Sequence, residues 1–213
     1  MDRRGVFVTL EGPDGAGKSS QATLLAERFR GAGREVVVTR EPGGTELGEK
    51  VRAMLLGTSS AGHDALSDAL LFNAARSRLV AEVIRPALVA GRVVVCDRYA
   101  DSTLAYQGYG GGIDRTALGR LAEVATGGLV PDRTVLIDLA VDAGLARRHG
   151  GATAELTRFE TSPAHDAAFH ERVRHGYFEL AAAEPARWRV VDGGRAREAV
   201  AADVWAEVAD LAE

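Results

Sequence analysis

Cysteine, lysine and long apolar runs are all scarce in this chain of 213 residues. Its single cysteine, Cys96, excludes a disulfide within the chain. No apolar stretch approaches the roughly 20 residues that a helix needs to cross a bilayer, so the sequence predicts no membrane partner. The 26 basic residues include only two lysines, Lys18 and Lys50. Because arginine supplies nearly all of the positive charge, a lysine at a given position suggests a specific role for that residue.

The charge balance argues against a general nucleic-acid partner. The net charge is −4 and the isoelectric point is near 5.8, so any phosphate binding must be local. The opening residues MDRRGVFVTLEG reach a glycine before a signal-like apolar run develops, and we therefore expect a cytoplasmic protein. With 46% hydrophobic residues and no internal repeat, we expect one domain over residues 1–213.

The order of apolar patterns predicts an α/β fold around a mostly parallel five-stranded sheet. Short valine-rich runs alternate with longer segments of helical period. The predicted strands are 5–12, 35–40, 92–98, 132–139 and 187–193. The predicted helices are 18–31, 47–57, 65–90, 114–127, 142–148, 164–184 and 195–212. Functional residues are then expected at the carboxyl ends of the strands.

The stretch GPDGAGKSS follows the first predicted strand and opens a predicted helix. It matches the G-x-x-x-x-G-K-S phosphate-binding loop in the context that this motif requires. Backbone N–H groups and the helix N-terminus favour phosphate there, Lys18 reaches the β and γ phosphates, and Ser19 is suited to bind Mg²⁺. A glycine-rich turn without a ligand would need the spacing, strand and helix to coincide by accident. The predicted nucleotide-binding residues are Gly12, Pro13, Asp14, Gly15, Ala16, Gly17, Lys18, Ser19 and Ser20.

A phosphate-binding loop serves both enzymes and nucleotide-regulated switches. A GTPase switch is expected to carry an N-K-x-D-like guanine reader, and the sequence has none. Instead, the strand at 92–98 ends in Asp97 and Arg98, which suit a Mg²⁺ shell and a second phosphate. This pattern favours phosphoryl transfer, although a surface ion pair remains an alternative for Asp97 and Arg98.

Four further segments resemble the thymidylate kinase family, in the family's order and over nearly the whole chain. They are REPGGTELGEKVR (40–52), LLFNAARSRL (70–79), DRYADSTLAYQGY (97–109) and a late RFE with FHERVRHGYFELA (158–181). The resemblance implies a three-layer P-loop NTPase fold with a short lid at about 146–162. It also implies a homodimer that uses ATP and Mg²⁺ to phosphorylate dTMP.

The resemblance also implies roles for particular residues on the dTMP side. Phe72 would stack on thymine and Arg76 would hydrogen-bond it, while Arg52 and Arg98 would bind the acceptor phosphate. The remaining implied site residues are Asp14 and Glu41 as nearby carboxylates, Thr103 and Gln107 at the base edge, and Tyr106 against the 2′ position. Core packing for Phe72, and local caps or salt bridges for the two carboxylates, are the alternatives.

The cation at the centre of the transfer path is the open point in this resemblance. Some relatives carry an arginine in the loop where this chain has Gly15, and others supply it from the lid. The chain therefore predicts a lid cation, from Arg158 first, then Arg147 or Arg148. The matching lid segment is less basic than the family's, and Thr157 replaces a usual aspartate. A kinase for another or a 5-substituted deoxyuridine monophosphate, and a degenerate nucleotide-binding protein, remain the alternatives.

Overall fold

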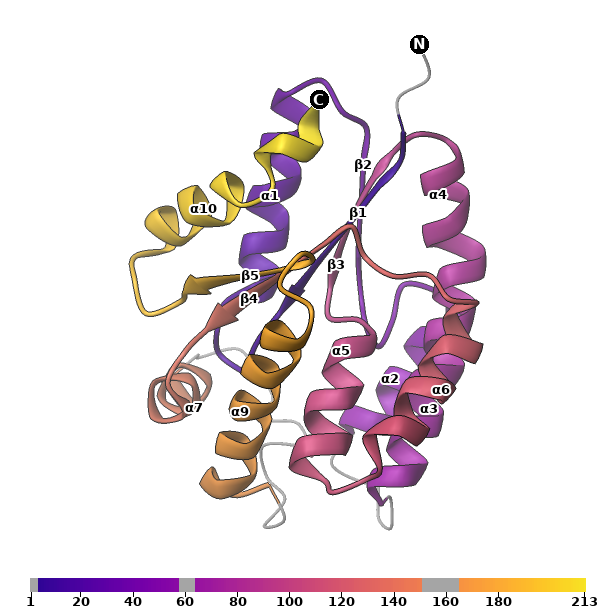
Figure 1. The fold of residues 1–213 in the computed structure, drawn as a ribbon, viewed down its shortest axis with the longest axis vertical. Coiled ribbons are helices and arrows are strands. Elements are labelled where there is room, and N and C mark those ends of the chain that lie inside the picture. Colours follow the sequence, from indigo (N-terminus) through magenta and orange to yellow (C-terminus); the bar gives the residue numbers. More distant parts are fainter. Residues whose placement is uncertain (1–3, 58–63, 151–164) are drawn as a thin grey trace.

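A single five-stranded sheet forms the centre of the molecule (Figure 1). The structure, a computed structural model, describes residues 4–57, 64–150 and 165–213, with the backbone alone at 148–150. All strand pairings are parallel, and the strand order is β2-β3-β1-β4-β5. The strands are β1 (Val6–Glu11), β2 (Val36–Arg40), β3 (Val93–Asp97), β4 (Arg133–Asp138) and β5 (Trp188–Asp192). The predicted five-stranded parallel sheet is therefore confirmed.

Helices cover both faces of the sheet. The α-helices are α1 (Lys18–Gly31), α2 (Glu46–Leu56), α3 (Ala65–Leu79), α4 (Arg85–Val89), α5 (Ala100–Thr103), α6 (Arg115–Thr126), α7 (Val141–Gly150), α9 (Ala167–Ala183) and α10 (Arg197–Ala206). Two π-helical segments, η1 (Val80–Ile84) and η2 (Leu104–Gly110), and the 3₁₀ turn η3 (Ala209–Ala212) complete the described elements.

The central strand β1 is buried along its whole length, and its side chains alternate between two cores. On one face, Val8 and Leu10 pack in a cluster with α1 and α10, which includes Phe29. On the other face, Phe7 packs with η1, α4 and Tyr99, where the Phe7 and Tyr99 rings meet edge to face at 5.0 Å. This arrangement confirms the predicted three-layer α/β fold.

The region between β3 and α6 differs from the prediction. No helix was predicted between residues 98 and 113, yet α5 and η2 form a continuous helical segment there. In η2 the backbone N–H of Gly111 donates to the Tyr106 carbonyl five residues earlier, at 2.8 Å. Gly108 and Gly110 suit this segment because side chains there would press on α6 and α9. The helix was not predicted from the sequence because glycine has a low helix propensity.

Two other predictions differ at helix boundaries or lie partly outside the description. The helix predicted over 65–90 is α3, η1 and α4 in succession, and the last predicted helix ends at Ala206 before η3. The described part of the predicted lid is the C-terminal half of α7. The rest of the predicted lid, residues 151–162 with Thr157 and Arg158, lies outside the described residues. Among the described residues, no helix is long and apolar enough to span a membrane.

Candidate active site

The loop between β1 and α1 has a backbone that glycine permits. Gly12, Gly15 and Gly17 all have positive φ angles, of 140°, 79° and 88°. A Cβ on Gly12 would lie 2.3 Å from the Ile137 carbonyl oxygen, and one on Gly15 would lie 2.3 Å from that of Gly144. Larger residues are therefore excluded by strain and by contact with β4 and α7. The loop can bring its backbone N–H groups close to an anion.

Lys18 begins α1 and points into the loop. Its side chain is buried, and its Nζ donates a hydrogen bond to the Pro13 carbonyl at 2.8 Å. Burial and then the nearby Arg98 guanidinium lower the pKa of Lys18 to about 8, against the opposing effect of Asp14. A buried ammonium group with few protein partners is suited to an anionic ligand, whose charge would favour its protonated form.

Ser19 and Asp97 meet beside the loop. The Ser19 hydroxyl donates a hydrogen bond to Asp97 Oδ2, which joins the start of α1 to the end of β3. A hydroxyl and a carboxylate are oxygen ligands of the kind that Mg²⁺ takes alongside substrate phosphates. The described residues contain no cluster of three or more His, Cys, Asp or Glu that could hold a metal by themselves. The donor set therefore fits a Mg²⁺ ion shared with a nucleotide.

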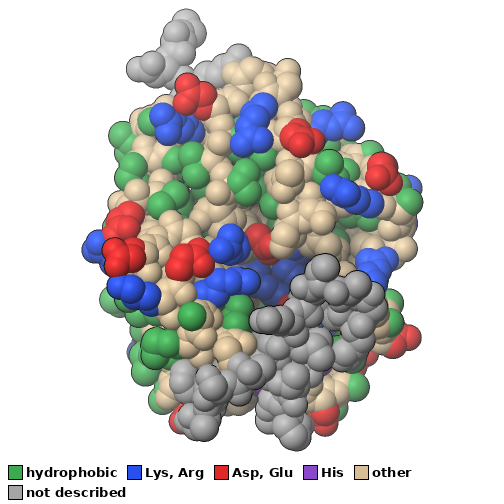
Figure 2. All heavy atoms as spheres, turned by 180° about the vertical axis from the view of Figure 1, so that it is seen from behind, with side chains coloured by type: hydrophobic (Ala, Val, Ile, Leu, Met, Phe, Trp, Pro, Cys, Tyr) green, Lys and Arg blue, Asp and Glu red, His purple; other side chains and the backbone are tan. Residues whose placement is uncertain are grey.

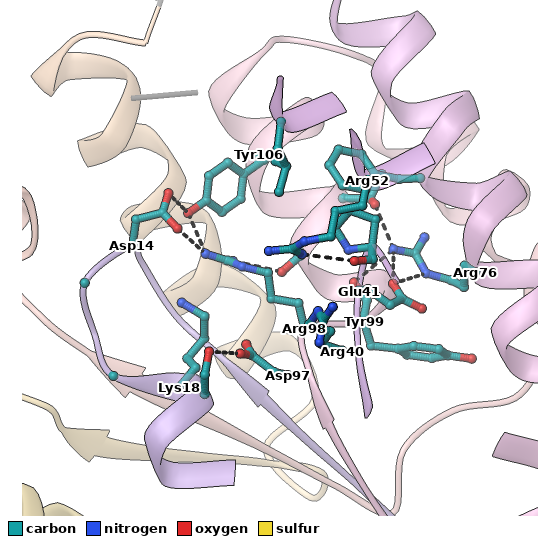
Figure 3. A pocket seen from close by; sticks show the side chains of 18 of the residues that line it. Asp14, Lys18, Arg40, Glu41, Arg52, Arg76, Asp97, Arg98, Tyr99 and Tyr106 are labelled. Carbon is teal, nitrogen blue, oxygen red and sulfur yellow. Dashed lines mark hydrogen bonds and ion pairs between the residues drawn. The ribbon is translucent and has the colours of Figure 1, made fainter. Parts of the chain in front are cut away.

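Arg98 follows β3 and lies at the centre of the site (Figure 3). Its φ of 71° is in the left-handed region, which is unusual for a residue with a Cβ. Its Nη2 donates to Asp14 Oδ1 at 2.6 Å and to the Tyr106 hydroxyl at 3.1 Å. Tyr106 in turn donates to Asp14 Oδ2 at 2.9 Å. Burial raises the pKa of Asp14, but Arg98 and Lys18 outweigh it and hold that pKa below its usual range.

Arg76 is fixed at the other end of the site. Its side chain is only 1% exposed, and its Nε donates to Glu41 Oε2 at 2.8 Å. Its Nη1 donates to Asn73 Oδ1 at 2.8 Å, and its Nη2 donates to Thr103 Oγ1 at 3.1 Å. Burial raises the pKa of Glu41, and Arg76 opposes that rise. The guanidinium is thus held in one orientation on α3, on the same helix face as Phe72.

Two more arginines lie near the end of β2. Arg52 Nη1 donates to the Pro42 carbonyl at 3.0 Å, and Arg40 Nη2 donates to Glu49 Oε1 at 3.1 Å. Arg40 was absent from the predicted site. The sequence feature that could have identified Arg40 is its position at the carboxyl end of a predicted strand. In the structure it lies beside Asp97 in the pairing of β2 with β3. On the face shown in Figure 2, Lys and Arg side chains gather in a hollow.

Most of the predicted site residues line one cavity of about 380 Å³. Those that do are Asp14, Gly15, Gly17, Lys18, Ser19, Ser20, Glu41, Arg52, Phe72, Arg76, Asp97, Arg98, Thr103, Tyr106, Gln107 and Arg147. The lining also includes five residues that were not predicted: Arg40, Pro42, Leu56, Tyr99 and Ser102.

Three predicted loop residues do not line the cavity, and the predicted lid arginines are only partly described. Gly12, Pro13 and Ala16 are buried in the loop and do not line the cavity. Arg147 lines the cavity and is exposed, and its Nη1 donates to the Gly193 carbonyl at 3.0 Å. Arg158 and the side chain of Arg148 are outside the described residues.

Comparisons with known proteins agree with one another. The model of the thymidylate kinase family matches residues 10–204. The thymidylate kinase of Solidesulfovibrio magneticus is 53% identical over 211 residues, which cover 97% of this chain and 100% of that protein. That of Deinococcus radiodurans is 46% identical over 207 residues, covering 97% and 98%. The crystal structure of thymidylate kinase from Ehrlichia chaffeensis has a TM-score of 0.74 and 36% identity, covering 94% of this chain and 97% of that one.

Proposed function

Because the chain belongs to the thymidylate kinase family, and transfers the γ-phosphoryl group of ATP to dTMP to give dTDP and ADP, we propose that its cavity holds the two nucleotides at opposite ends. The observation that carries this proposal is the position of Arg98, between the phosphate-binding loop and Arg76 (Figure 3). Phe72, on the same helix as Arg76, also lines the cavity. Lys18 and Asp14 lie on one side of Arg98, and Arg76 with Glu41 lies on the other.

The donor end is the loop and the start of α1. The loop residues 12–20 would hold the ATP phosphates with backbone N–H groups, and the Lys18 ammonium would bind the β and γ phosphates. Supporting this assignment, the Nζ of Lys18 donates its hydrogen bond to a neutral carbonyl, that of Pro13, which a phosphate oxygen can replace. Ser19 and Asp97 would hold the Mg²⁺ ion, which neutralises phosphate charge when it is bound.

The acceptor end is formed by α3, α5 and η2. Phe72 would stack on thymine while Arg76 donates to it, with Thr103 and Gln107 at the base edge. Tyr106 would crowd the 2′ position and disfavour ribonucleotides. Its hydroxyl already bonds Asp14 and Arg98, which supports a fixed ring position.

The acceptor phosphate would lie between Arg52 and Arg98. Both side chains line the cavity, and the Asp14 carboxylate orients the Arg98 guanidinium. Glu41 pairs with Arg76 rather than with either phosphate-binding arginine, so we assign it to orienting the base reader.

Transfer requires alignment and charge neutralisation rather than covalent catalysis by the protein. An oxygen of the dTMP phosphate attacks the γ-phosphorus of ATP, the bond to the β,γ-bridging oxygen breaks, and ADP leaves with that oxygen. Lys18 and Arg98 neutralise the two ends of this path. The central cation would come from the lid through Arg158, Arg147 or Arg148, since a side chain at Gly15 would contact Gly144.

A coupled ADP-release assay with a panel of acceptors tests this assignment. We expect dTMP to have the highest kcat/KM among dTMP, dUMP, dCMP, dGMP and the ribonucleotide of thymine. Thymidine should support no comparable turnover, because it offers Arg52 and Arg98 no phosphate. EDTA should abolish activity, and added Mg²⁺ should restore it. A higher kcat/KM for another monophosphate, or ADP release that does not depend on the acceptor, would contradict the proposal.

We also propose that the chain forms a homodimer through α2 and α3. Leu47 and Met54 on α2, and Leu66 and Leu70 on α3, are 42–51% exposed, and the two helices pack against each other. Such a surface is suited to a second copy of this chain. The negative net charge supports no nucleic-acid partner, and we place the enzyme in the cytoplasm, where both nucleotides are available.

Sedimentation velocity tests the dimer. We expect the mass of two chains at micromolar concentration, and a shift toward one chain when Met54 and Leu70 are both changed to aspartate, because charges would be buried at the interface. Val190→Asp is the matched control, since Val190 is 48% exposed on the edge strand β5. A monomeric wild-type protein, or an equal effect of the control, would rule out this interface.

A further inference from the structure

Glu11, the last residue of β1, is a fully buried carboxylate that does not line the cavity. Three groups donate to it: the Tyr99 backbone N–H at 2.7 Å, the Ser102 hydroxyl at 2.6 Å and the Tyr177 hydroxyl at 3.0 Å. Burial and then the charge of Asp101 raise its pKa to about 7. A buried carboxylate lowers the stability of the fold when it is ionised, unless hydrogen bonds compensate for the lost water. The groups that bond to Glu11 therefore indicate its role.

Both hydroxyls that donate to Glu11 also contact Arg98. Arg98 Nη1 donates to Ser102 Oγ at 3.1 Å and to the Tyr177 hydroxyl at 3.1 Å. Each hydroxyl has one hydrogen and two lone pairs. When the hydrogen points to Glu11, the lone pairs are available to the Arg98 N–H groups. The Ser102 and Tyr177 hydroxyls also lie 2.9 Å apart, so the two hydroxyls and Glu11 form one network. An ionised carboxylate only accepts hydrogen bonds, and it therefore orients the hydroxyls of this network toward itself.

The third bond acts on the backbone beside Arg98. The Tyr99 N–H that Glu11 accepts belongs to the peptide immediately after Arg98, whose φ is 71°. The Arg98 N–H itself donates to the Leu10 carbonyl at 3.0 Å, next to Glu11 on β1. A non-glycine residue persists in the left-handed region only where its surroundings hold it there. Glu11 and its neighbour Leu10 therefore hold both peptides of Arg98.

We infer that Glu11 is a positioning residue for Arg98, which it aims at the acceptor phosphate through Ser102, Tyr177 and the Tyr99 N–H. The inference rests on the proposed role of Arg98. It gives the three contacts a shared role, because all of them reach Arg98 or the peptide that follows it. Asp14 and Tyr106 hold the guanidinium from the cavity side, and Glu11 holds it from the side of the sheet.

Glu11→Gln tests the inference at pH 8, above the pKa of about 7 to which burial raises Glu11. We expect kcat/KM for dTMP to fall on the order of 10- to 100-fold, as for other groups that orient a functional side chain, with KM for ATP within about twofold. Calorimetry should show that dTMP binding weakens while thymidine, which lacks the phosphate, binds as before. Thr9→Val is the matched control, because Thr9 lies on the same strand and face as Glu11, and the change removes a buried 2.9 Å hydrogen bond to Thr134 on β4.

Two further variants identify the route of the effect. Tyr177→Phe, which removes one of the two hydroxyls, should reproduce part of the loss and serves as the test if Glu11→Gln does not fold. In an Arg98→Ala background, Glu11→Gln should add little, since the residue it positions is gone. Additive losses, or equal weakening of thymidine and dTMP, would overturn the inference. So would a change confined to KM for ATP, which would indicate an effect through Lys18.

The same experiment separates the inference from the function on which it rests. If the Arg98→Ala protein still binds dTMP more tightly than thymidine by the wild-type ratio, the assignment of Arg98 to the acceptor phosphate is wrong. The inference about Glu11 is then wrong as well. If Arg98→Ala removes that preference and Glu11→Gln does not reduce it, only the inference is wrong.

Discussion

Lys18→Ala is expected to lower kcat by about 100- to 1000-fold while the fold is retained. The ammonium group is a preorganised charge at the end of the loop, and losing one such contact to a developing charge typically has this effect. The side chain donates to the Pro13 carbonyl within the loop and is not part of the apolar clusters that pack on the sheet, so the core should be retained. Steady-state kinetics at saturating ATP and dTMP would measure the loss.

The other lysine of the chain provides the control. Lys50 is exposed on α2, where it pairs with Glu46 at 2.6 Å, so Lys50→Ala should change kcat little. Thermal unfolding of both variants would show whether the fold persists. Near-normal turnover in a folded Lys18→Ala protein would remove the loop lysine from the mechanism.

One of the three lid alanine variants is expected to lower kcat on the order of 1000-fold, as loss of a transition-state arginine does in related chemistry. The variants are Arg147→Ala, Arg148→Ala and Arg158→Ala, and Arg158 is the first choice. The loop cannot supply this charge at position 15, where φ is 79° and a Cβ would lie 2.3 Å from the Gly144 carbonyl oxygen. Nucleotide affinities should change only modestly, because the contact is made in the transition state.

An arginine distant from the cavity serves as the reference for these variants. Arg30 is exposed at the end of α1 opposite to Lys18, and Arg30→Ala should leave kcat unchanged. Three lid variants with near-wild-type single-turnover rates would show that the central charge comes from elsewhere. Single-turnover measurement is needed because product release, rather than chemistry, limits kcat in many enzymes.

Local patterns were enough to predict the sheet and the loop. The strands are short runs rich in β-branched residues, as in VVVTR and VVVCD. The loop motif carries its own context, since its glycines stand at positive φ directly between a strand and a helix. Both signals depend on neighbours within about 15 residues, and such neighbours are visible in one sequence.

Contacts between distant segments were harder to predict. Arg76 was predicted to read a base, but its bonds to Glu41 and Thr103 join residues 35 and 27 positions away. Glu11 resembles an ordinary residue before a glycine, and its partners Ser102 and Tyr177 lie 91 and 166 positions along the chain. Hydrophobic periodicity carries no information about which polar groups will meet, so this inner layer of the site required the structure.

The position of β1 in the middle of the sheet has a consequence for how the protein is made. On the ribosome β1 emerges first, but its two neighbours are β3, from Val93, and β4, which ends at Asp138. Until that residue has left the exit tunnel, the first strand has unpaired backbone groups on at least one side, and the loop lacks the Ile137 backbone against which Gly12 packs. Closing such long-range pairings is slow. The loop of the nascent chain is therefore incomplete for most of its synthesis, and during that time its valine-rich strands have unpaired edges of the kind that favours aggregation.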